Sequence, residues 1–207
     1  PSLSSFSEQI KEKSKQCIDR DLLVSVLKKQ NKSINLSEES LMNIEFLSDN
    51  NTFTITTGHQ LCLFTGPLYF IYKIISTINL AERLKKEFCQ YNFVPIFWMA
   101  SEDHDFTEVN HIHLYGKKFI WESNERGIVG NFKTKKILRI IDEIDSFLGS
   151  DRVKKSLVKL LKRCYSKDTL SEATRDFVNE LFGEYGLVIM DSNDKYLKQK
   201  LIPIMKE

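Results

Sequence analysis

The strongest constraint on the fold is a pattern that occurs twice between residues 52 and 105. Each time, an apolar, β-branched run stops abruptly in polar and titratable residues. Residues 53–57 lead into a Gly-His-Gln segment, and residues 94–98 lead, a few residues later, into Ser-Glu-Asp-His-Asp. A long stretch of helical periodicity joins the two runs. Strands linked through a helix form a parallel pair, and ligands bind at the carboxyl ends of strands in an open parallel sheet. The pattern therefore predicts an α/β fold whose polar residues gather at one edge of a parallel sheet.

The rest of the chain extends this architecture. Its patterns predict strands at residues 52–57, 93–99 and 187–190, and helices at 7–29, 37–47, 66–88, 134–148, 151–164, 169–182 and from 194 onward. A hairpin is expected where residues 109–115 and 118–123 flank Gly116-Lys117, and Pro203 should kink or end the last helix. We expect an N-terminal helical segment (1–51) and a core (52–207) that is incomplete by itself, with a hairpin and helical insertion at about 107–165.

Charge and composition argue against several classes of protein. The 207 residues carry 30 basic and 28 acidic side chains, a net charge of +2, whereas bulk nucleic-acid binding needs a concentrated basic surface. No stretch approaches the ~18 apolar residues of a membrane span, and the chain shows no signal-peptide pattern. The four cysteines form no C-x-x-C pair, which favours a reduced, cytosolic setting. Because the chain opens at Pro1 and ends within a helical pattern, we expect it to be part of a longer protein.

The first polar block has the features of an anion site. Gly58 permits close approach of a ligand to the backbone, and a helix that begins at Gly66-Pro67 presents free N–H groups suited to phosphate or carboxylate. The spacing is not that of a Walker P-loop, and an ordinary tight strand-to-helix turn explains the glycines equally well. Tyr69 and Lys73 lie one helical turn apart and either lean toward this end or form a surface pair. Cys62 is more simply a small packed residue than a nucleophile.

The second block places three carboxylates around an imidazole. Next to the apolar Trp98 and Phe106, these groups should acquire separated pKa values, which suits general acid–base chemistry. A solvated acidic loop is the plainer alternative. A metal site at His59, His104, His111 and His113 is a third interpretation, but no H-x-x-x-H or H-E-x-x-H spacing is present. We therefore expect no stoichiometric zinc or iron, and we expect His111 and His113 to face solvent or pack in the hairpin.

The candidate site residues fall into two groups. For catalysis they are His59, Asp103, His104 and Asp105. For binding of substrate or nucleotide they are Thr57, Gly58, Gln60, Thr65, Gly66, Tyr69, Lys73, Trp98, Ser101, Glu102 and Asp191.

Several segments carry a resemblance to a known family. They are Thr-Gly-His-Gln-Leu and Leu-Phe-Thr-Gly-Pro-Leu-Tyr within 57–69, Tyr-Lys-Ile at 72–74, Phe-Trp-Met-Ala-Ser-Glu-Asp-His-Asp-Phe at 97–106 and Phe-Gly-Glu-Tyr-Gly-Leu-Val-Ile-Met-Asp at 182–191. From about residue 20 onward the chain resembles the N-terminal half of the bacillithiol biosynthesis cysteine-adding enzymes, the cysteine ligases. The resemblance implies a Rossmann-like core and, in the longer family members, a helical coiled-coil arm after it.

The resemblance also implies an activity, the addition of L-cysteine to the amino group of glucosaminyl-malate. ATP or a related nucleotide is implied as the activating cosubstrate through a cysteinyl-adenylate; Mg²⁺ is compatible with such a nucleotide, and the sequence requires no metal. In that scheme His59 would steady phosphate charge, the helix at Gly66 would hold phosphate, and residues 101–105 would recognise an amine or act as base. A homodimer of the full-length protein is compatible with the resemblance. Three alternatives stay open: another adenylating or nucleotidyl-transferring enzyme, a metal-dependent hydrolase, and an inactive fragment that serves as a binding module or scaffold.

Overall fold

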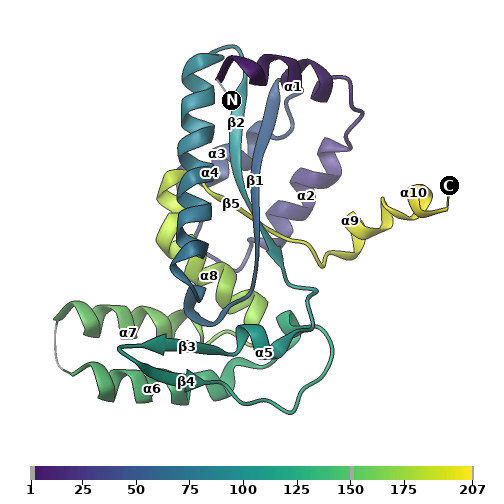
Figure 1. Cartoon of the computed structure of the whole chain (residues 1–207). Coiled ribbons are helices and arrows are strands. Elements are labelled where there is room, and N and C mark those ends of the chain that lie inside the picture. The colour runs from purple at the N-terminus through teal and green to yellow at the C-terminus, as the bar shows by residue number, and fades with distance from the viewer. Residues whose placement is uncertain (1–2, 150–151, 207) are drawn as a thin grey trace.

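A three-stranded parallel sheet forms the centre of the computed structural model, which describes residues 3–149 and 152–206. The strands are β1 (Thr52–Gln60), β2 (Asn92–Ala100) and β5 (Val188–Asp191), in the spatial order β1-β2-β5. Both pairings are parallel, so the three carboxyl ends lie at the same edge of the sheet (Figure 1). The predicted α/β fold with a parallel sheet is therefore confirmed.

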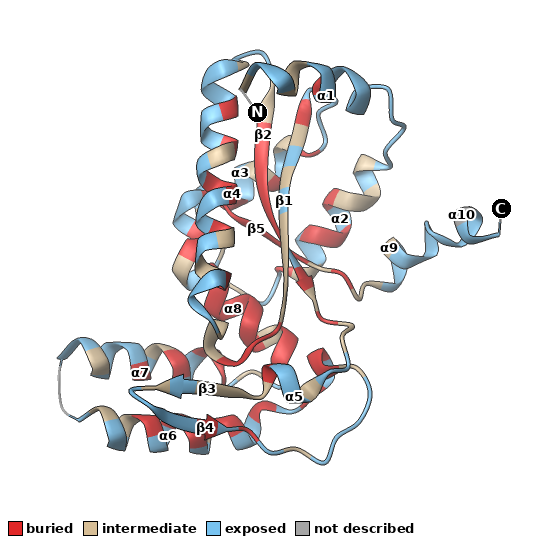
Figure 2. Ribbon diagram, in the orientation of Figure 1, coloured by how far each residue is buried: buried red, intermediate tan, exposed pale blue. Residues whose placement is uncertain are grey.

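Helices cover both faces of this sheet. Alternate residues of β2 point to opposite sides: Phe97 and Met99 pack with α4 (Leu68–Glu87) and α8 (Leu170–Phe182). Val94 and Ile96 instead pack with α2 (Arg20–Gln30) and α3 (Glu38–Phe46). Burial is concentrated on β2, on β5 and on the helix faces turned toward them, whereas β1 is mostly half-buried or exposed (Figure 2). No helix within the described ranges combines the length and hydrophobicity that a membrane crossing requires.

The N-terminal region differs from the single helix predicted at 7–29. The structure has a 3₁₀ turn (Leu3–Ser5), then α1 (Phe6–Lys13), and a separate α2 that begins after Asp19, whose side chain accepts the Leu22 N–H at 3.1 Å. The two helices serve different faces of the sheet. Ile10 of α1 packs with residues on the α4 side, whereas α2 packs on the other side. The chain must cross from one face to the other, so one continuous helix is excluded.

Both predicted N-terminal strands are too short. The parallel ladder between β1 and β2 continues past residue 57 and pairs Gly58 with Trp98, His59 with Met99 and Gln60 with Ala100. The Gly-His-Gln segment is therefore the last part of a strand and not a loop. Because consecutive side chains of a strand point to opposite faces of the sheet, the His59 side chain lies on one face and that of Gln60 on the other.

The insertion forms a lobe beside the carboxyl edge of the sheet (Figure 1). It contains α5 (Phe106–Val109), the hairpin β3 (His111–Leu114) and β4 (Lys117–Ile120), α6 (Ile137–Leu148) and α7 (Arg152–Cys164). The hairpin is confirmed, but its turn lies at Tyr115-Gly116, one residue before the predicted position. Both turn residues have positive φ (48° and 79°), as a two-residue type I′ turn requires. The sequence analysis did not predict α5.

Short elements complete the chain. The 3₁₀ turns are Leu63–Thr65, Val129–Asn131, Thr134–Lys136 and Gly183–Tyr185. The predicted helix at 169–182 is confirmed as α8 with its Thr169–Glu172 capping box. Beyond β5, two short helices, α9 (Lys195–Gln199) and α10 (Ile202–Met205), replace the single predicted helix, and Pro203 stands in the first turn of α10. The division into 1–51 and 52–207 stays a prediction.

Candidate functional site

His59 stands at the end of β1 on the face covered by α4. Its ring centroid lies 5.2 Å from that of Phe70 and 6.1 Å from that of Tyr69. Nδ1 is 3.1 Å from the backbone oxygen of Gln60, and a carbonyl only accepts, so Nδ1 carries the proton and Nε2 keeps its lone pair. Burial lowers the pKa of His59, and the charge of Lys73 lowers it further. His59 is therefore a neutral imidazole at pH 7, with Nε2 as an acceptor.

The Gln60 side chain joins the end of β1 to two carboxylates. Its Nε2 donates to Asp103 Oδ2 at 2.6 Å and to Glu108 Oε2 at 2.8 Å. The other oxygen of Asp103 accepts the Asp105 N–H at 2.9 Å. This backbone hydrogen bond, followed by the one from Gln60, lowers the pKa of Asp103, so that the carboxylate is ionised at neutral pH. We call Gln60, Asp103 and Glu108 the carboxylate clamp.

The turn between β1 and α4 has an unusual backbone. Phe64, Thr65 and Gly66 all have positive φ, at 52°, 73° and 62°. A Cβ on Gly66 would lie 2.4 Å from Cys62 Cβ, so glycine is required here for conformation and for space. Cys62 is buried, and burial together with Glu108 and Asp103 raises the pKa of its thiol to about 11. The expectation that Cys62 is a packed residue and not a nucleophile agrees with this environment.

The amino end of α4 is open to a ligand. Pro67 is the N-cap and supplies no side-chain hydrogen bond to the first N–H groups of the helix. The Phe70 N–H donates to the Pro67 oxygen at 2.9 Å, which leaves the N–H groups of Leu68 and Tyr69 without an acceptor within the helix, and the helix dipole adds partial positive charge there. Lys73, one turn further along, donates to the backbone oxygen of Gly58 and lies 5.2 Å from the Tyr69 ring centroid. Tyr69 and Lys73 thus both lean toward the strand end, as one of the two interpretations proposed.

A cavity of about 460 Å³ lies between this turn and the hairpin. Its lining residues are Cys62, Gly66, Pro67, Leu68, Glu108, His111, Ile112 and His113. His111 and His113 share one face of β3, with ring centroids 5.4 Å apart. His111 is half-buried and His113 is exposed, as expected, and both line this cavity. In the described part of the chain, no three His, Cys, Asp or Glu side chains gather in a way that could hold a metal ion.

Other candidate residues have structural partners or point elsewhere. Asp105 caps α5 by accepting the Glu108 N–H at 3.3 Å. His104 is exposed, and its Nδ1 lies 3.1 Å from its neighbour's backbone oxygen at Glu102. Trp98 is on the opposite face of the sheet from His59 and packs against Gly58. Trp98 is therefore on the other face of the sheet from His59, whereas His104 and Asp105 stay next to Asp103, whose pKa their backbone N–H groups help to lower.

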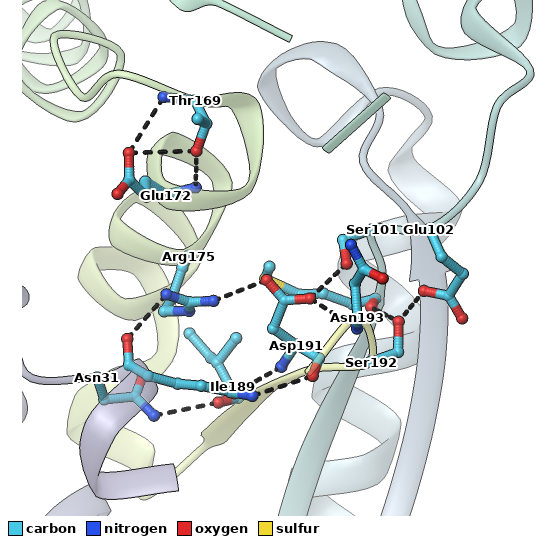
Figure 3. A network of polar contacts seen from close by, with 12 residues as sticks. Asn31, Ser101, Glu102, Thr169, Glu172, Arg175, Ile189, Asp191, Ser192 and Asn193 are labelled. Atoms are coloured by element: carbon cyan, nitrogen blue, oxygen red, sulfur yellow. Dashed lines mark hydrogen bonds and ion pairs between the residues drawn. The ribbon is translucent and has the colours of Figure 1, made fainter. Parts of the chain in front are cut away.

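The remaining candidates divide between the site and its support. Thr57 lines a shallow groove beside β1 with Tyr69 and Lys73. Thr65 belongs to the strained turn. Ser101 donates to Asp191, and Ser192 donates to Glu102, so these three candidates hold the 101–105 segment against β5 (Figure 3).

Sequence reasoning missed two residues that the structure places here. Glu108, the second carboxylate of the clamp, stands in an unpredicted short helix and belongs to no motif. Arg175 pairs with Asp191 from the middle of α8. Nothing in the sequence distinguished Arg175 from a surface arginine, because the buried side of α8 also carries polar residues such as Ser171 and Asn179, and nothing indicated its partner.

These features define a class, a Rossmann-like α/β domain with a polar site at the carboxyl edge of its parallel strands. Comparison with known families agrees: the model of the "Bacillithiol biosynthesis BshC, N-terminal Rossmann-like domain" matches residues 1–207. The chain belongs to this family.

Individual relatives extend the comparison. A protein of Flavobacterium johnsoniae named "Putative cysteine ligase BshC" is 49% identical over 210 residues, which cover 100% of this chain and 40% of the relative. Proteins of the same name from Cytophaga hutchinsonii and Anoxybacillus flavithermus are 44% and 34% identical, over 100% and 94% of this chain and 38% of each relative. The chain thus spans about 40% of the length of the relatives that it matches.

Proposed function

We propose that this chain is the N-terminal part of a cysteine ligase of bacillithiol biosynthesis, which joins the carboxyl group of L-cysteine to the amino group of glucosaminyl-malate. Membership of the BshC family and the name of its relatives support this assignment. Because the chain spans about 40% of those relatives, the activity is proposed for the whole protein. A cytosolic location and a homodimer belong to the same proposal.

The observation that carries the proposal is that the end of β1 carries a neutral imidazole on His59 and, on the next residue, the Gln60 amide that holds the ionised carboxylate of Asp103. An amine attacks an acyl group only as the free base, so a ligase needs a group that accepts a proton from the ammonium form. The unprotonated Nε2 of His59 is suited to that task, since the lowered pKa keeps it unprotonated at pH 7. This role replaces the phosphate-steadying role that the resemblance implied for His59.

The carboxylate clamp supports binding of the amine. Gln60 holds oxygens of Asp103 and Glu108 on the same nitrogen, so two negative side chains face the same small region. Asp103 and Glu108 both raise the pKa of the neighbouring Cys62 thiol, which indicates a negative potential at this corner. An ammonium group is attracted there, and the adjoining cavity provides room for the attached molecule.

The open amino end of α4 supports binding of a nucleotide phosphate. Amide formation from a free carboxylate is unfavourable in water, so the carboxyl group must first be activated. In the proposed sequence, the cysteine carboxylate attacks the α-phosphate of ATP, forming cysteinyl-adenylate and releasing pyrophosphate. The amine then displaces AMP, and His59 accepts the proton that the amine loses.

The test is product formation by the whole protein with L-cysteine, glucosaminyl-malate and ATP, followed by mass spectrometry. We expect His59→Gln and Asp103→Asn to lower the rate about 10²-fold or more while the melting temperature stays near that of the parent. Asp21→Asn is the matched control, because Asp21 is an exposed carboxylate far from the candidate site. Its neighbour Arg20 donates to the backbone oxygen of Thr52, at the amino end of β1, whereas the site is at the carboxyl end. It should keep the full rate.

The outcomes separate the alternatives. Pyrophosphate release that depends on cysteine but not on the amino sugar supports adenylation, whereas ATP use with another acid indicates a different adenylating enzyme. Hydrolytic activity that depends on one equivalent of bound metal would overturn the ligase assignment. Full turnover by both His59→Gln and Asp103→Asn would show that the site lies elsewhere.

A further inference from the structure

Arg175 is a charged side chain buried behind the candidate site. It is 7% exposed, on the face of α8 that packs against the sheet. Nη1 donates to the backbone oxygen of Gln30 at 2.8 Å, and Nη2 donates to Asp191 Oδ2 at 2.9 Å. Nε has no partner among the described residues. The guanidinium therefore connects α8, the end of α2 and the end of β5.

Asp191 passes this connection to the segment that follows β2. Its second oxygen, Oδ1, accepts the hydroxyl of Ser101 and the Asn193 N–H, the latter at 3.0 Å (Figure 3). The next residue along, Ser192, donates its backbone N–H to the backbone oxygen of Met99 at 3.2 Å and its hydroxyl to the Glu102 carboxylate. The first two residues of the 101–105 segment are thus attached to the end of β5, immediately before Asp103 of the clamp.

Stability alone is a weak reason for such an arrangement. A buried ion pair gains little over well-packed apolar residues, because desolvation offsets the Coulombic attraction. Burial lowers the pKa of Arg175, which is the sign of that desolvation. The geometry, by contrast, is specific: two nitrogens of one planar fork reach acceptors on two different elements, which a lysine ammonium does not reproduce.

We propose that Arg175 is a positioning residue of the candidate site. Acting through Asp191 and Ser101, it holds the 101–105 segment in the place where Asp103 meets Gln60. Without the guanidinium, the half-buried Asp191 carboxylate would lose its cationic partner and would turn outward, which releases the Ser101 hydroxyl. The proposal rests on the proposed function, because it treats the 101–105 segment as part of the site.

The test compares Arg175→Met, Arg175→Lys and Asp191→Asn in the whole protein. Amide hydrogen exchange of a peptide covering residues 100–106 should become at least about tenfold faster in Arg175→Met and Asp191→Asn, with Arg175→Lys between them and the parent. Arg163→Met is the matched control. It removes an arginine from an exposed pair with Glu180 and should leave that peptide unchanged.

Kinetics provide the second measurement. We expect kcat to fall at least about tenfold in Arg175→Met while KM for cysteine changes less than about threefold, because a displaced clamp affects the reaction geometry. Arg175→Lys should recover part of kcat. A purely structural role would lower the yield of folded protein but leave kcat per folded molecule unchanged.

The outcomes distinguish this proposal from the proposed function. If Arg175→Met does not fold, Asp191→Asn carries the test, since it removes the charge at nearly constant volume. A folded Arg175→Met or Asp191→Asn protein with parental exchange at 100–106, or with parental kcat, overturns the positioning role. Faster exchange in a protein whose parent makes no product supports the positioning of the segment and rejects the ligase assignment.

Discussion

His59 shows how a single position acquires its chemistry from its surroundings. Strand pairing places it on the α4 face, Phe70 and Tyr69 partly remove it from water, and the Gln60 carbonyl selects its tautomer. Each influence comes from a different element. Together they produce a neutral imidazole with a defined tautomer, which an isolated His-Gln dipeptide would not have.

The lowered pKa of His59 makes a prediction about pH. A histidine whose folded pKa is below its unfolded value of 6.5 binds fewer protons in the native state, so its contribution to stability is lost as pH falls through 6.5. The measurement is the free energy of unfolding at about pH 7.5 and at about pH 5.5, one value above and one below the unfolded pKa. We expect the parent to lose more stability over this interval than His59→Gln. Equal losses would mean that His59 titrates as an ordinary exposed histidine.

Gly66 yields a second prediction at this scale. Gly66→Ala should lower the free energy of unfolding by about 1–3 kcal/mol, because its Cβ meets Cys62 and its φ is positive. Gly58→Ala is the control, since the nearest atom to its Cβ lies at an ordinary 3.4 Å, and it should change stability by less than about 1 kcal/mol. Urea denaturation measures both. A Gly66→Ala protein as stable as the parent would contradict the described turn.

At the scale of elements, α8 links the two parts of the molecule. It packs with the sheet and with α7 of the insertion, and it carries Arg175. Its start is defined by the capping box, in which Thr169 accepts the Glu172 N–H at 3.3 Å and Glu172 accepts the Thr169 N–H at 3.1 Å. The position of Arg175 relative to β5 therefore depends on where this helix begins.

Removal of this cap should lower the stability of the protein by a measurable amount. Thr169→Ala should lower the free energy of unfolding by about 1 kcal/mol, the usual cost of losing an N-cap hydroxyl. Thr107→Ala removes an exposed threonine hydroxyl of the short helix α5, which donates to Asp105, and should stay within about 0.5 kcal/mol of the parent. Chemical denaturation of both variants checks this comparison. Equal effects would show that the cap does not stabilise α8 beyond an ordinary surface contact.

At the scale of the whole molecule, the two outer strands of the sheet differ in what lies along their outer edges. Side chains satisfy the outer edge of β5: Gln30 bonds the N–H and oxygen of Asp191, and Asn31 bonds the oxygen of Ile189. Within residues 3–149 and 152–206, no strand pairs with the outer edge of β1, which is nine residues long. An edge of this length is a template for pairing with another chain.

We therefore expect the 207-residue chain to self-associate through β1 as its concentration rises. Thr54 and Thr56 are exposed on this strand, and a Thr54→Lys/Thr56→Lys variant should shift association to higher concentration, because charge opposes edge pairing. Sedimentation velocity over a concentration series is the measurement. Ser25→Lys, on the exposed side of α2, is the control for added charge and should behave as the parent. Association unaffected by the β1 lysines would locate the contact elsewhere.

What the sequence by itself determined is the class of fold and the location of the site. The apolar runs and helical periodicity require parallel strands covered on both faces, and parallel strands bring their polar ends to one edge. These are local patterns, so residues 52–60 and 92–105 were enough to place the ends of β1 and β2 at the same edge of the sheet, and the family followed from the same segments.

Only the tertiary structure decided the rest, because it depends on contacts between residues distant in the sequence. The break between α1 and α2 follows from the two faces that these helices cover. The extension of β1 to Gln60 comes from its pairing with β2, 40 residues away in register. Glu108 joined the site through a hydrogen bond to Gln60, and Asp191 became a support through Arg175, 16 residues away in the sequence but opposite it in space. Sequence patterns report which residues are polar and which are buried; which polar groups meet is decided by packing.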